Sequence, residues 1–259
     1  KEPWYRGQIA FADHKEPRAA DFATLGPVLD ARLITALSNL VNGEHASKKS
    51  ELQLYAHQAE AIDAAVSASR DVVISTSTGS GKSLVYLAAV FDSLLRDADA
   101  TAIFIFPTKA LAQDQLGKLN HLANALGKCG IPKEQLICAC LDGDTPTKER
   151  TRVRRGARVV LTNPDMLHSH LLPRHGEYSR LLGQLRYVVL DEMHVYRGAF
   201  GAHVASVVRR LRRLLGETEN ESLHFVACSA TVSNPGEHFQ HLVGPRAHAP
   251  KVITTDGSP

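Results

Sequence analysis

Short, continuously apolar runs recur along the chain from about residue 72 onwards and alternate with longer amphipathic stretches. Continuous apolar runs are typical of parallel strands that are buried on both faces. Six of them predict strands, at 72–74, 102–106, 136–140, 159–161, 187–190 and 225–228. Between them, 84–95 and 111–126 carry apolar residues at helical spacing. This alternation predicts an α/β fold, a mostly parallel sheet with helices on both faces.

The first 50 residues lack this alternation of apolar runs and amphipathic stretches. Leu29, Leu33, Ala36, Leu37 and Leu40 recur at helical spacing and predict one helix in otherwise irregular chain. A polar stretch at 42–50 is typical of a linker. We therefore expect an N-terminal extension at 1–50 and one α/β domain at 51–259. Because the chain starts on Lys rather than Met, we also expect it to be a piece of a longer protein.

Composition is that of a globular protein, with 44% apolar and 22% charged residues. No apolar run approaches the roughly 20 residues of a membrane span, so we expect no membrane contact. The net charge of +3 permits nucleic-acid binding without requiring it. Two basic clusters stand out. The first adjoins a candidate strand-binding loop, so it is either a binding surface or a solvated helix face. For the second we expect a solvated helix face. They are Lys148, Arg150, Arg152, Arg154, Arg155 and Arg158, and Arg209, Arg210, Arg212 and Arg213.

The cysteines and histidines do not form a recognisable metal motif. The four cysteines include no CxxC pair, so we expect buried, reduced thiols. His238 and His241 have HxxH spacing without a third ligand nearby, and we expect no zinc in this chain. Reduced thiols fit a nuclear protein if the source is eukaryotic, and otherwise a cytoplasmic one.

A glycine-rich segment follows the predicted strand at 72–74 and opens the next helix. Glycines at Gly79 and Gly81 remove Cβ atoms where the chain must pass close to a polyphosphate. Lys82 is placed to neutralise the β- and γ-phosphates, and the hydroxyl of Ser83 to bind Mg²⁺. Thr76 stands where the strict pattern has glycine. The residues that we expect to contact ATP are Thr78, Gly79, Ser80, Gly81, Lys82 and Ser83.

Two carboxylates follow the predicted strand at 187–190. We expect Asp191 to hold Mg²⁺ and Glu192 to orient and deprotonate the attacking water. Two further features acquire meaning in this context. The hydroxyls of Ser229 and Thr231, at another strand end, are predicted to bond His194 and couple the ATP state to domain movement. The carboxamide of Gln58 is predicted to pair with the adenine edge.

Three strand-to-helix corners present hydroxyls and free helix N-terminal amides, which suit the phosphates of a nucleic-acid backbone without base readout. Each alone is consistent with plain helix capping. Their common placement at strand ends favours a single-strand track with low sequence specificity. The residues that we expect to contact the strand are Pro107, Thr108, Lys109, Gln113, Gly143, Thr162, Asn163 and Asp165.

As a set, these motifs resemble the first RecA-like domain of superfamily-two helicases, in the same order. The stretches 4–9, 194–204 and 228–235 further resemble the RecQ-like Hrq/MrfA group of DNA helicases. The aromatic-rich loop that follows the acidic motif in RecQ proper is lacking. The resemblance implies an ATP- and Mg²⁺-dependent 3′–5′ DNA helicase motor that acts on single-stranded or tailed DNA in repair and genome maintenance. It also implies a second RecA-like domain in the same polypeptide and a C-terminal zinc-binding domain, both outside this chain.

Other functions remain open at this point. An acidic motif ending in His also occurs in RNA-directed helicases. Intact Lys82, Ser83, Asp191 and Glu192 argue against an idle nucleic-acid-binding scaffold. The strand-binding corners argue against a small-molecule kinase or transporter ATPase, and stimulation of ATP hydrolysis by nucleic acid discriminates that class.

Overall fold

Seven parallel strands form one sheet, in the order β5-β6-β4-β7-β8-β3-β9. The computed structural model describes residues 19–42, 52–216 and 222–259. The six predicted strands are confirmed, and the seventh, β9, was not predicted. In sheet order the strands are β5 (Cys138–Cys140), β6 (Val159–Thr162), β4 (Thr101–Ile105), β7 (Leu185–Leu190), β8 (His224–Ser229), β3 (Val72–Ser75) and β9 (Lys251–Ile253).

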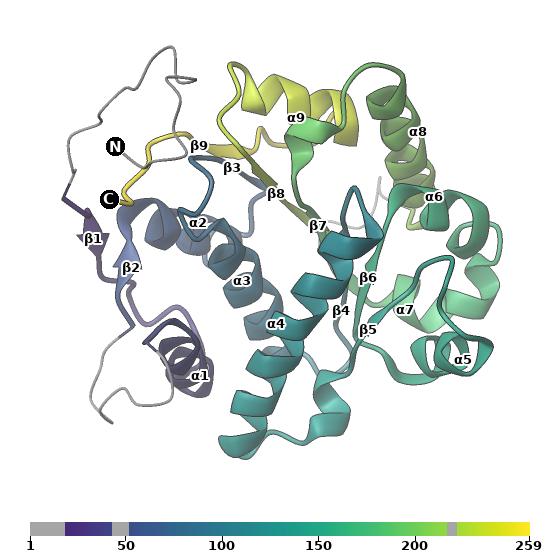
Figure 1. Cartoon of the computed structure of the whole chain (residues 1–259), viewed down its shortest axis with the longest axis horizontal. Coiled ribbons are helices and arrows are strands. Elements are labelled where there is room, and N and C mark those ends of the chain that lie inside the picture. The colour runs from purple at the N-terminus through teal and green to yellow at the C-terminus, as the bar shows by residue number, and fades with distance from the viewer. Residues whose placement is uncertain (1–18, 43–51, 217–221) are drawn as a thin grey trace, which may run out of the picture.

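Helices cover both faces of the sheet, as Figure 1 shows. Alternate strand residues enter two separate cores: Ile74 and Phe104 face one side, and Val73 and Ile103 face the other. The first core holds α1 (Ala31–Asn42), α2 (Ala56–Val66), α3 (Lys82–Arg96) and α4 (Lys109–Lys128). The second holds α5 (Thr147–Gly156), α7 (Ser179–Gly183), α8 (Gly198–Leu214) and α9 (Pro235–Val243). The short helix α6 (Pro164–Met166) follows β6. This arrangement confirms the predicted α/β architecture.

One predicted strand begins later than expected. Lys133–Leu136 forms a 3-10 helix, so the strand predicted at 136–140 is reduced to β5. Cys138 and Cys140 both face the first core, as expected for alternate residues of a strand. Cys138 and Cys228 are buried and Cys129 and Cys140 half-buried, so the expected burial holds fully for two of the four thiols.

Residues 19–42, from the predicted N-terminal extension, pack onto the rest of the chain. The predicted helix is α1, and it lies against α3 and α4 with Leu33 and Leu37 fully buried. The backbone N–H of Asp30 donates to Asp92 Oδ1 on α3 at 2.9 Å. Strand β1 (Phe22–Ala23) pairs antiparallel with β2 (Leu54–Tyr55), directly before α2. Of the predicted linker at 42–50, Asn42 ends α1 and the rest lies outside the described residues, as does the stretch 4–9. In the part of the chain that the structure describes, no helix is long and apolar enough to span a membrane.

Candidate nucleotide and nucleic-acid site

The glycine-rich segment forms a closed loop between β3 and α3. Gly79 and Gly81 have φ angles of +88° and +75°, which favour glycine. Lys82 begins α3 and turns its ammonium group back into the loop, where Nζ donates to the carbonyls of Thr76 at 3.0 Å and Ser77 at 2.6 Å. An ammonium inside a ring of main-chain groups at a helix N-terminus is the geometry that receives a polyphosphate.

Thr76, where the strict pattern has glycine, takes part in this loop. Its side chain is fully buried, and its hydroxyl lies 2.7 Å from the hydroxyl of Ser80. The Ser80 hydroxyl in turn donates to the carbonyl of Ser77 at 2.9 Å. The threonine that replaces the glycine of the strict pattern therefore adds a hydrogen bond within the loop.

Gln58 lies against the phosphate loop. Its side chain is 4% exposed, and Nε2 donates to the carbonyls of Ser80 at 3.3 Å and Gly81 at 3.1 Å. Its Oε1 accepts from the backbone N–H of Tyr55 at 3.0 Å. A Cβ on residue 81 would lie 2.3 Å from Gln58 Nε2, so this contact is a second reason for glycine there. The predicted adenine contact stays a prediction, because these bonds all join Gln58 to the chain itself.

Asp191 and Glu192 follow β7 at the same edge of the sheet. Asp191 Oδ2 accepts from the hydroxyl of Tyr86 at 3.1 Å, and Oδ1 accepts from the backbone N–H of Glu192 at 2.9 Å. Burial raises the pKa of Asp191 to about 6, against the opposing effect of these bonds and of Lys82. A buried carboxylate with a raised pKa gains most from a cation beside it, which fits a magnesium ligand. Glu192 has φ +50°, a strained conformation of the kind that concentrates at functional sites.

His194 contacts the predicted coupling segment through the main chain. Its Nδ1 accepts a hydrogen bond from the backbone N–H of Ala230 at 3.2 Å and lies 3.3 Å from Glu192 Oε2. The sequence prediction assigned this contact to the hydroxyls of Ser229 and Thr231. Ser229 Oγ is instead buried, with no hydrogen-bond partner among the described residues. The link between the acidic end of β7 and the end of β8 is thus present in a different chemical form.

The three predicted strand-binding corners meet at the carboxyl ends of β4, β5 and β6. Lys109 Nζ contacts Asp144 Oδ2 at 2.7 Å, and Gln113 Nε2 donates to Asp142 Oδ2 at 3.3 Å, so the first two corners are joined. Both pairs border a cavity of about 540 Å³. Thr162 is buried and its hydroxyl donates to the carbonyl of Leu141 at 2.7 Å. Thr162 therefore ties the third corner to the second and does not offer its hydroxyl to solvent.

The remaining predicted residues of these corners cap helices or stay exposed. Thr108 accepts from the backbone N–H of Leu111 at the start of α4, and Asn163 accepts from that of Met166 at 2.8 Å at the start of α6. Gly143 and Asp165 are exposed, and Pro107 is half-buried between β4 and α4. The helix capping that the sequence offered as an alternative is therefore present at the first and third corners, through Thr108 and Asn163. The exposed residues Gly143 and Asp165 lie at the same ends of the strands.

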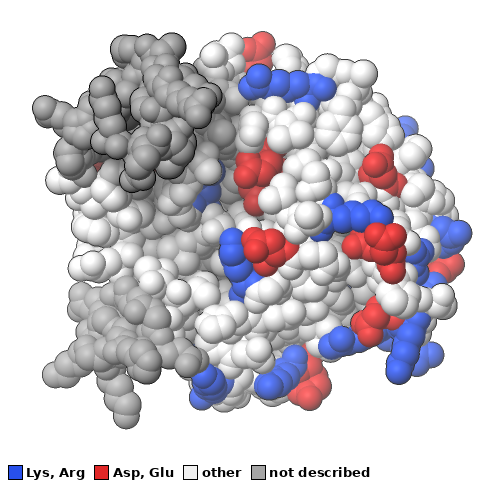
Figure 2. Space-filling model, in the orientation of Figure 1, with Lys and Arg blue, Asp and Glu red and all other residues white. Residues whose placement is uncertain are grey.

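The first basic cluster is not one surface. Arg158 is 5% exposed and donates to main-chain carbonyls, so it belongs to the core. Arg150 donates to the carbonyls of Thr145, Asp142 and Gly143, and so holds the second corner in shape. On the face of the molecule that Figure 2 shows, Lys and Arg are interspersed with Asp and Glu and do not form one basic patch.

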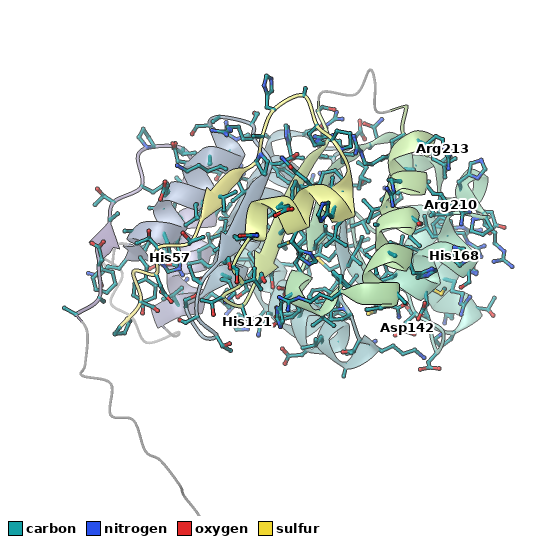
Figure 3. All side chains as sticks on the ribbon, turned by 90° about the horizontal axis from the view of Figure 1, so that it is seen from above. His57, His121, Asp142, His168, Arg210 and Arg213 are labelled. Atoms are coloured by element: carbon teal, nitrogen blue, oxygen red, sulfur yellow. The ribbon has the colours of Figure 1, made fainter. Side chains whose placement is uncertain are left out.

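The second basic cluster lies on α8. Figure 3 shows Arg210 and Arg213 pointing outward from this helix, and Arg210 contacts the ring of His168 at 2.8 Å. Arg212 instead donates to the carbonyl of Pro245 at 3.0 Å. The predicted solvated face holds for the exposed members, whereas Arg212 fastens α8 to the chain after α9.

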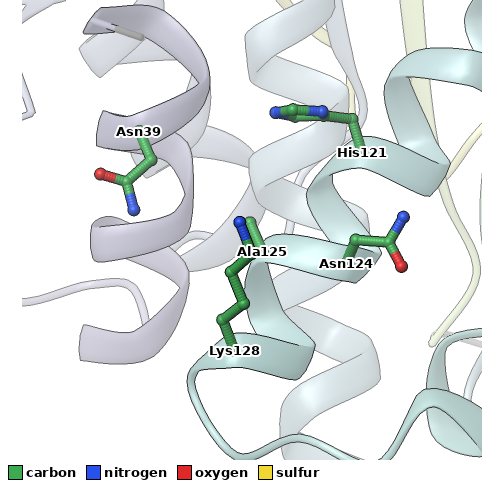
Figure 4. Close-up of a pocket in the computed structure, with 5 residues that line it drawn as sticks. All are labelled: Asn39, His121, Asn124, Ala125 and Lys128. Atoms are coloured by element: carbon green, nitrogen blue, oxygen red, sulfur yellow. The ribbon is translucent and has the colours of Figure 1, made fainter. Parts of the chain in front are cut away.

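Sequence reasoning missed an aromatic cavity beside the phosphate loop. It measures about 550 Å³, and its walls include Phe22, Tyr55, Gln58 and Ser83. The rings of Phe22 and Tyr55 are stacked with centroids 5.3 Å apart, because β1 pairs with β2 and places residue 22 beside residue 55. The aromatic residue three positions before Gln58 was the only signal in the sequence. A second cavity, about 450 Å³, lies between α1 and the far half of α4, away from the strand ends, and includes His121 (Figure 4).

Residues 55–238 match the family model described as DEAD/DEAH box helicase. The chain belongs to the DEAD/DEAH box helicase family. ATP-dependent helicase HRQ1 of Saccharomyces cerevisiae is 44% identical over 213 residues, which are 79% of this chain and 18% of that protein. An uncharacterized ATP-dependent helicase of Bacillus subtilis, YprA, is 39% identical over 229 residues, 88% of this chain and 28% of that protein.

A solved structure agrees with this helicase assignment. The crystal structure of the DUF1998 helicase MrfA bound to DNA and AMPPNP superimposes with a TM-score of 0.82 at 37% identity, over 95% of this chain and 32% of that one. The predicted resemblance to the Hrq/MrfA group is confirmed. This chain spans between about a fifth and a third of the length of these relatives.

Proposed function

We propose that this chain is the ATP-binding motor domain of an ATP-dependent DNA helicase, which binds Mg²⁺-ATP and the backbone of single-stranded DNA. The observation that carries the proposal is the placement of Lys82 and the buried Asp191 at the carboxyl ends of β3 and β7. Lys82 begins α3, and Tyr86 of the same helix donates to Asp191 Oδ2 at 3.1 Å. A lysine in a phosphate loop beside a buried carboxylate is what a Mg²⁺-nucleotide requires. Support for DNA comes from MrfA, a relative whose solved structure holds DNA and AMPPNP.

Each residue of the site has its own task in ATP binding or hydrolysis. Lys82 leaves the carbonyls of Thr76 and Ser77 and neutralises the β- and γ-phosphates. Ser83 and Asp191 hold Mg²⁺, which supplies charge neutralisation when bound. Glu192 orients the attacking water and accepts its proton. The aromatic cavity beside Gln58, with Phe22 and Tyr55 in its wall, receives the adenine ring.

Three finer assignments rest on the family resemblance. The arginine fingers belong to a second RecA-like domain, and such a residue is worth about 10³ to 10⁵ in turnover in related NTPases. We therefore expect this chain alone to bind nucleotide and to hydrolyse it hardly at all. Translocation in the 3′–5′ direction and a role in DNA repair are the other two features that the resemblance implies.

The strand-binding part of the proposal is tested on one helix. Lys109 and Lys118 both lie on α4 and are similarly exposed, but only Lys109 stands at the corner of the predicted track. Affinity for labelled single-stranded DNA, measured by fluorescence anisotropy, is expected to fall in Lys109→Ala and to depend less steeply on salt concentration. Lys118→Ala serves as the matched control. Equal losses in both variants would show that α4 contributes charge only, and preference for RNA over DNA would move the protein to the RNA-directed helicases.

A further inference from the structure

The segment 254–259 runs from β9 back to the phosphate loop. Figure 1 shows this last part of the chain reaching the start of α2 and the strand β1. Asp256 Oδ2 accepts from the backbone N–H of Ser77 at 2.9 Å and from the Ser77 hydroxyl. Its other oxygen, Oδ1, accepts from the backbone N–H and the hydroxyl of Ser258, at 2.9 and 2.6 Å. The carboxylate is therefore fixed at both oxygens, one of them on the phosphate loop.

The next residue reaches the other side of the same loop through a histidine. The backbone N–H of Gly257 donates to His57 Nδ1 at 3.1 Å, and His57 Nε2 lies 3.0 Å from the carbonyl of Ser80. Because Nδ1 accepts, the neutral ring carries its proton on Nε2 and donates it to Ser80. His57, which Figure 3 labels, is 2% exposed. Burial lowers the pKa of His57, which favours the neutral form that this relay needs.

The backbone around Gly257 leaves little freedom. Its carbonyl accepts from the backbone N–H of Asp21 at 2.8 Å, and a Cβ at this position would lie 3.1 Å from the carbonyl of Asp21 and 3.3 Å from the amide of Ala56. Hydrogen bonds thus hold Asp256 and Gly257 in a fixed position against the phosphate loop. Their contacts, Ser77 and Ser80, bracket the exposed Thr78 and Gly79.

We propose that Asp256 and His57 are positioning residues for the phosphate loop, so that nucleotide binding and the placement of segment 254–259 depend on each other. The inference rests on the proposed nucleotide-binding function. Ordering a loop on ligand binding costs conformational entropy, and contacts that order it beforehand raise affinity. A coupling of this kind is reciprocal, so a ligand in the loop also stabilises the segment that holds it.

The role of Asp256 differs from that of Lys82. Lys82 donates to the carbonyl of Ser77 and must leave it to reach a phosphate. Asp256 binds the N–H and hydroxyl of the same residue and does not have to move. Although partial burial opposes it, hydrogen bonds from Ser258 and Ser77 lower the pKa of Asp256 well below its usual range. The carboxylate therefore keeps Ser77 in place while Lys82 changes partner.

The test is a titration of the 259-residue chain with fluorescent ADP and Mg²⁺. Asp256→Asn and His57→Ala are each expected to weaken binding by about 5-fold or more, the usual lower bound of such couplings. Asp99→Asn is the matched control. Asp99 is an exposed carboxylate between α3 and β4, at the amino-terminal end of β4, whereas the phosphate loop follows the carboxyl end of β3. Lys82→Ala, which is expected to abolish binding, separates the two proposals.

A second measurement on the unaltered chain covers the case in which a variant does not fold. ADP is expected to slow hydrogen exchange at the amides of Gly257 and Ser258, and to shift the ring nitrogen signals of His57 in the NMR spectrum. A merely structural contact would lower thermal stability without either effect. Asp256→Asn binding ADP as tightly as the unaltered chain, or more tightly, overturns this inference alone. Failure of the unaltered chain to bind ADP overturns the nucleotide site as well.

Discussion

Arg158 joins several chain segments at the amino-terminal ends of the strands, on the side of the sheet away from the nucleotide site. Its guanidinium donates to four main-chain carbonyls, those of Leu94, Asp97, Ala100 and Gln135. Two of these carbonyls close the C-terminal end of α3, where a cation is favoured. Arg158→Met keeps the apolar stem and removes the donors, and so leaves acceptors without partners in a nearly closed environment.

The magnitude follows from these contacts. A hydrogen bond to a charged group contributes about 1.5–3 kcal/mol, and an unsatisfied buried acceptor costs about 1–3 kcal/mol. These values do not add, and water reaches the partly buried bonds to Gln135 and Asp97. We therefore expect Arg158→Met to lower the free energy of unfolding by about 3–5 kcal/mol. This is a large part of the roughly 5–15 kcal/mol of a typical domain.

The assay is urea unfolding followed by far-UV circular dichroism. Arg152→Met is the control, because the Arg152 side chain is 60% exposed and lies 3.6 Å from Glu149 on the same helix. We expect that variant to stay within about 0.5 kcal/mol of the unaltered chain. A loss below about 1 kcal/mol in Arg158→Met would refute the reasoning, since the four bonds would then add almost nothing beyond what water provides.

Three further predictions concern burial. Burial lowers the pKa of both His57 and His224, so the unfolded chain binds protons more readily than the native one. The stability that these rings contribute is then complete above about pH 6.5 and falls as the pH drops towards their native pKa values. The melting temperature should decrease on acidification through this window, and less steeply in a variant with both replaced by Gln; an unchanged slope would contradict the account. Burial raises the pKa of Cys138 to about 12, so this thiol should react with a disulfide reagent at mildly alkaline pH only after denaturation, as peptide mapping would show. A Cβ at Gly201 would lie 2.4 Å from the carbonyl oxygen of Tyr196, so Gly201→Ala should cost about 1–3 kcal/mol in urea unfolding, and a neutral effect would show that the start of α8 shifts freely.

The six predicted strands were recognisable because parallel strands that are buried leave a continuous apolar signal in the sequence. Strand β9 was not, because three residues at the edge, with Lys251 and Val252 only partly covered, leave no such run. The start of β5 was misplaced because Leu136 is buried equally well in a 3-10 helix. Apolar character indicates burial, and only the backbone pairing decides the element.

The site residues that follow strand ends were predictable from local spacing. Those that depend on distant pairing were not. The contact of Phe22 with Tyr55 needs the pairing of β1 with β2, and the contact of Asp256 with Ser77 joins residues 179 positions apart. Arg158 belongs to a cluster of basic residues in the sequence, and a run of charged residues does not indicate which of its members is buried. Only the fold shows its four carbonyl partners.

We propose that Lys82 and the acidic end of β7 form a nucleic-acid-dependent ATPase site. The most direct test is ATP hydrolysis by the full-length protein that contains this chain, alone and with single-stranded DNA or RNA, with Lys82→Ala as control. We expect single-stranded DNA to stimulate ATP hydrolysis strongly, and this stimulation to disappear in the Lys82→Ala variant. Stimulation by RNA alone would contradict the DNA assignment, and no stimulation by either nucleic acid would contradict the helicase function itself.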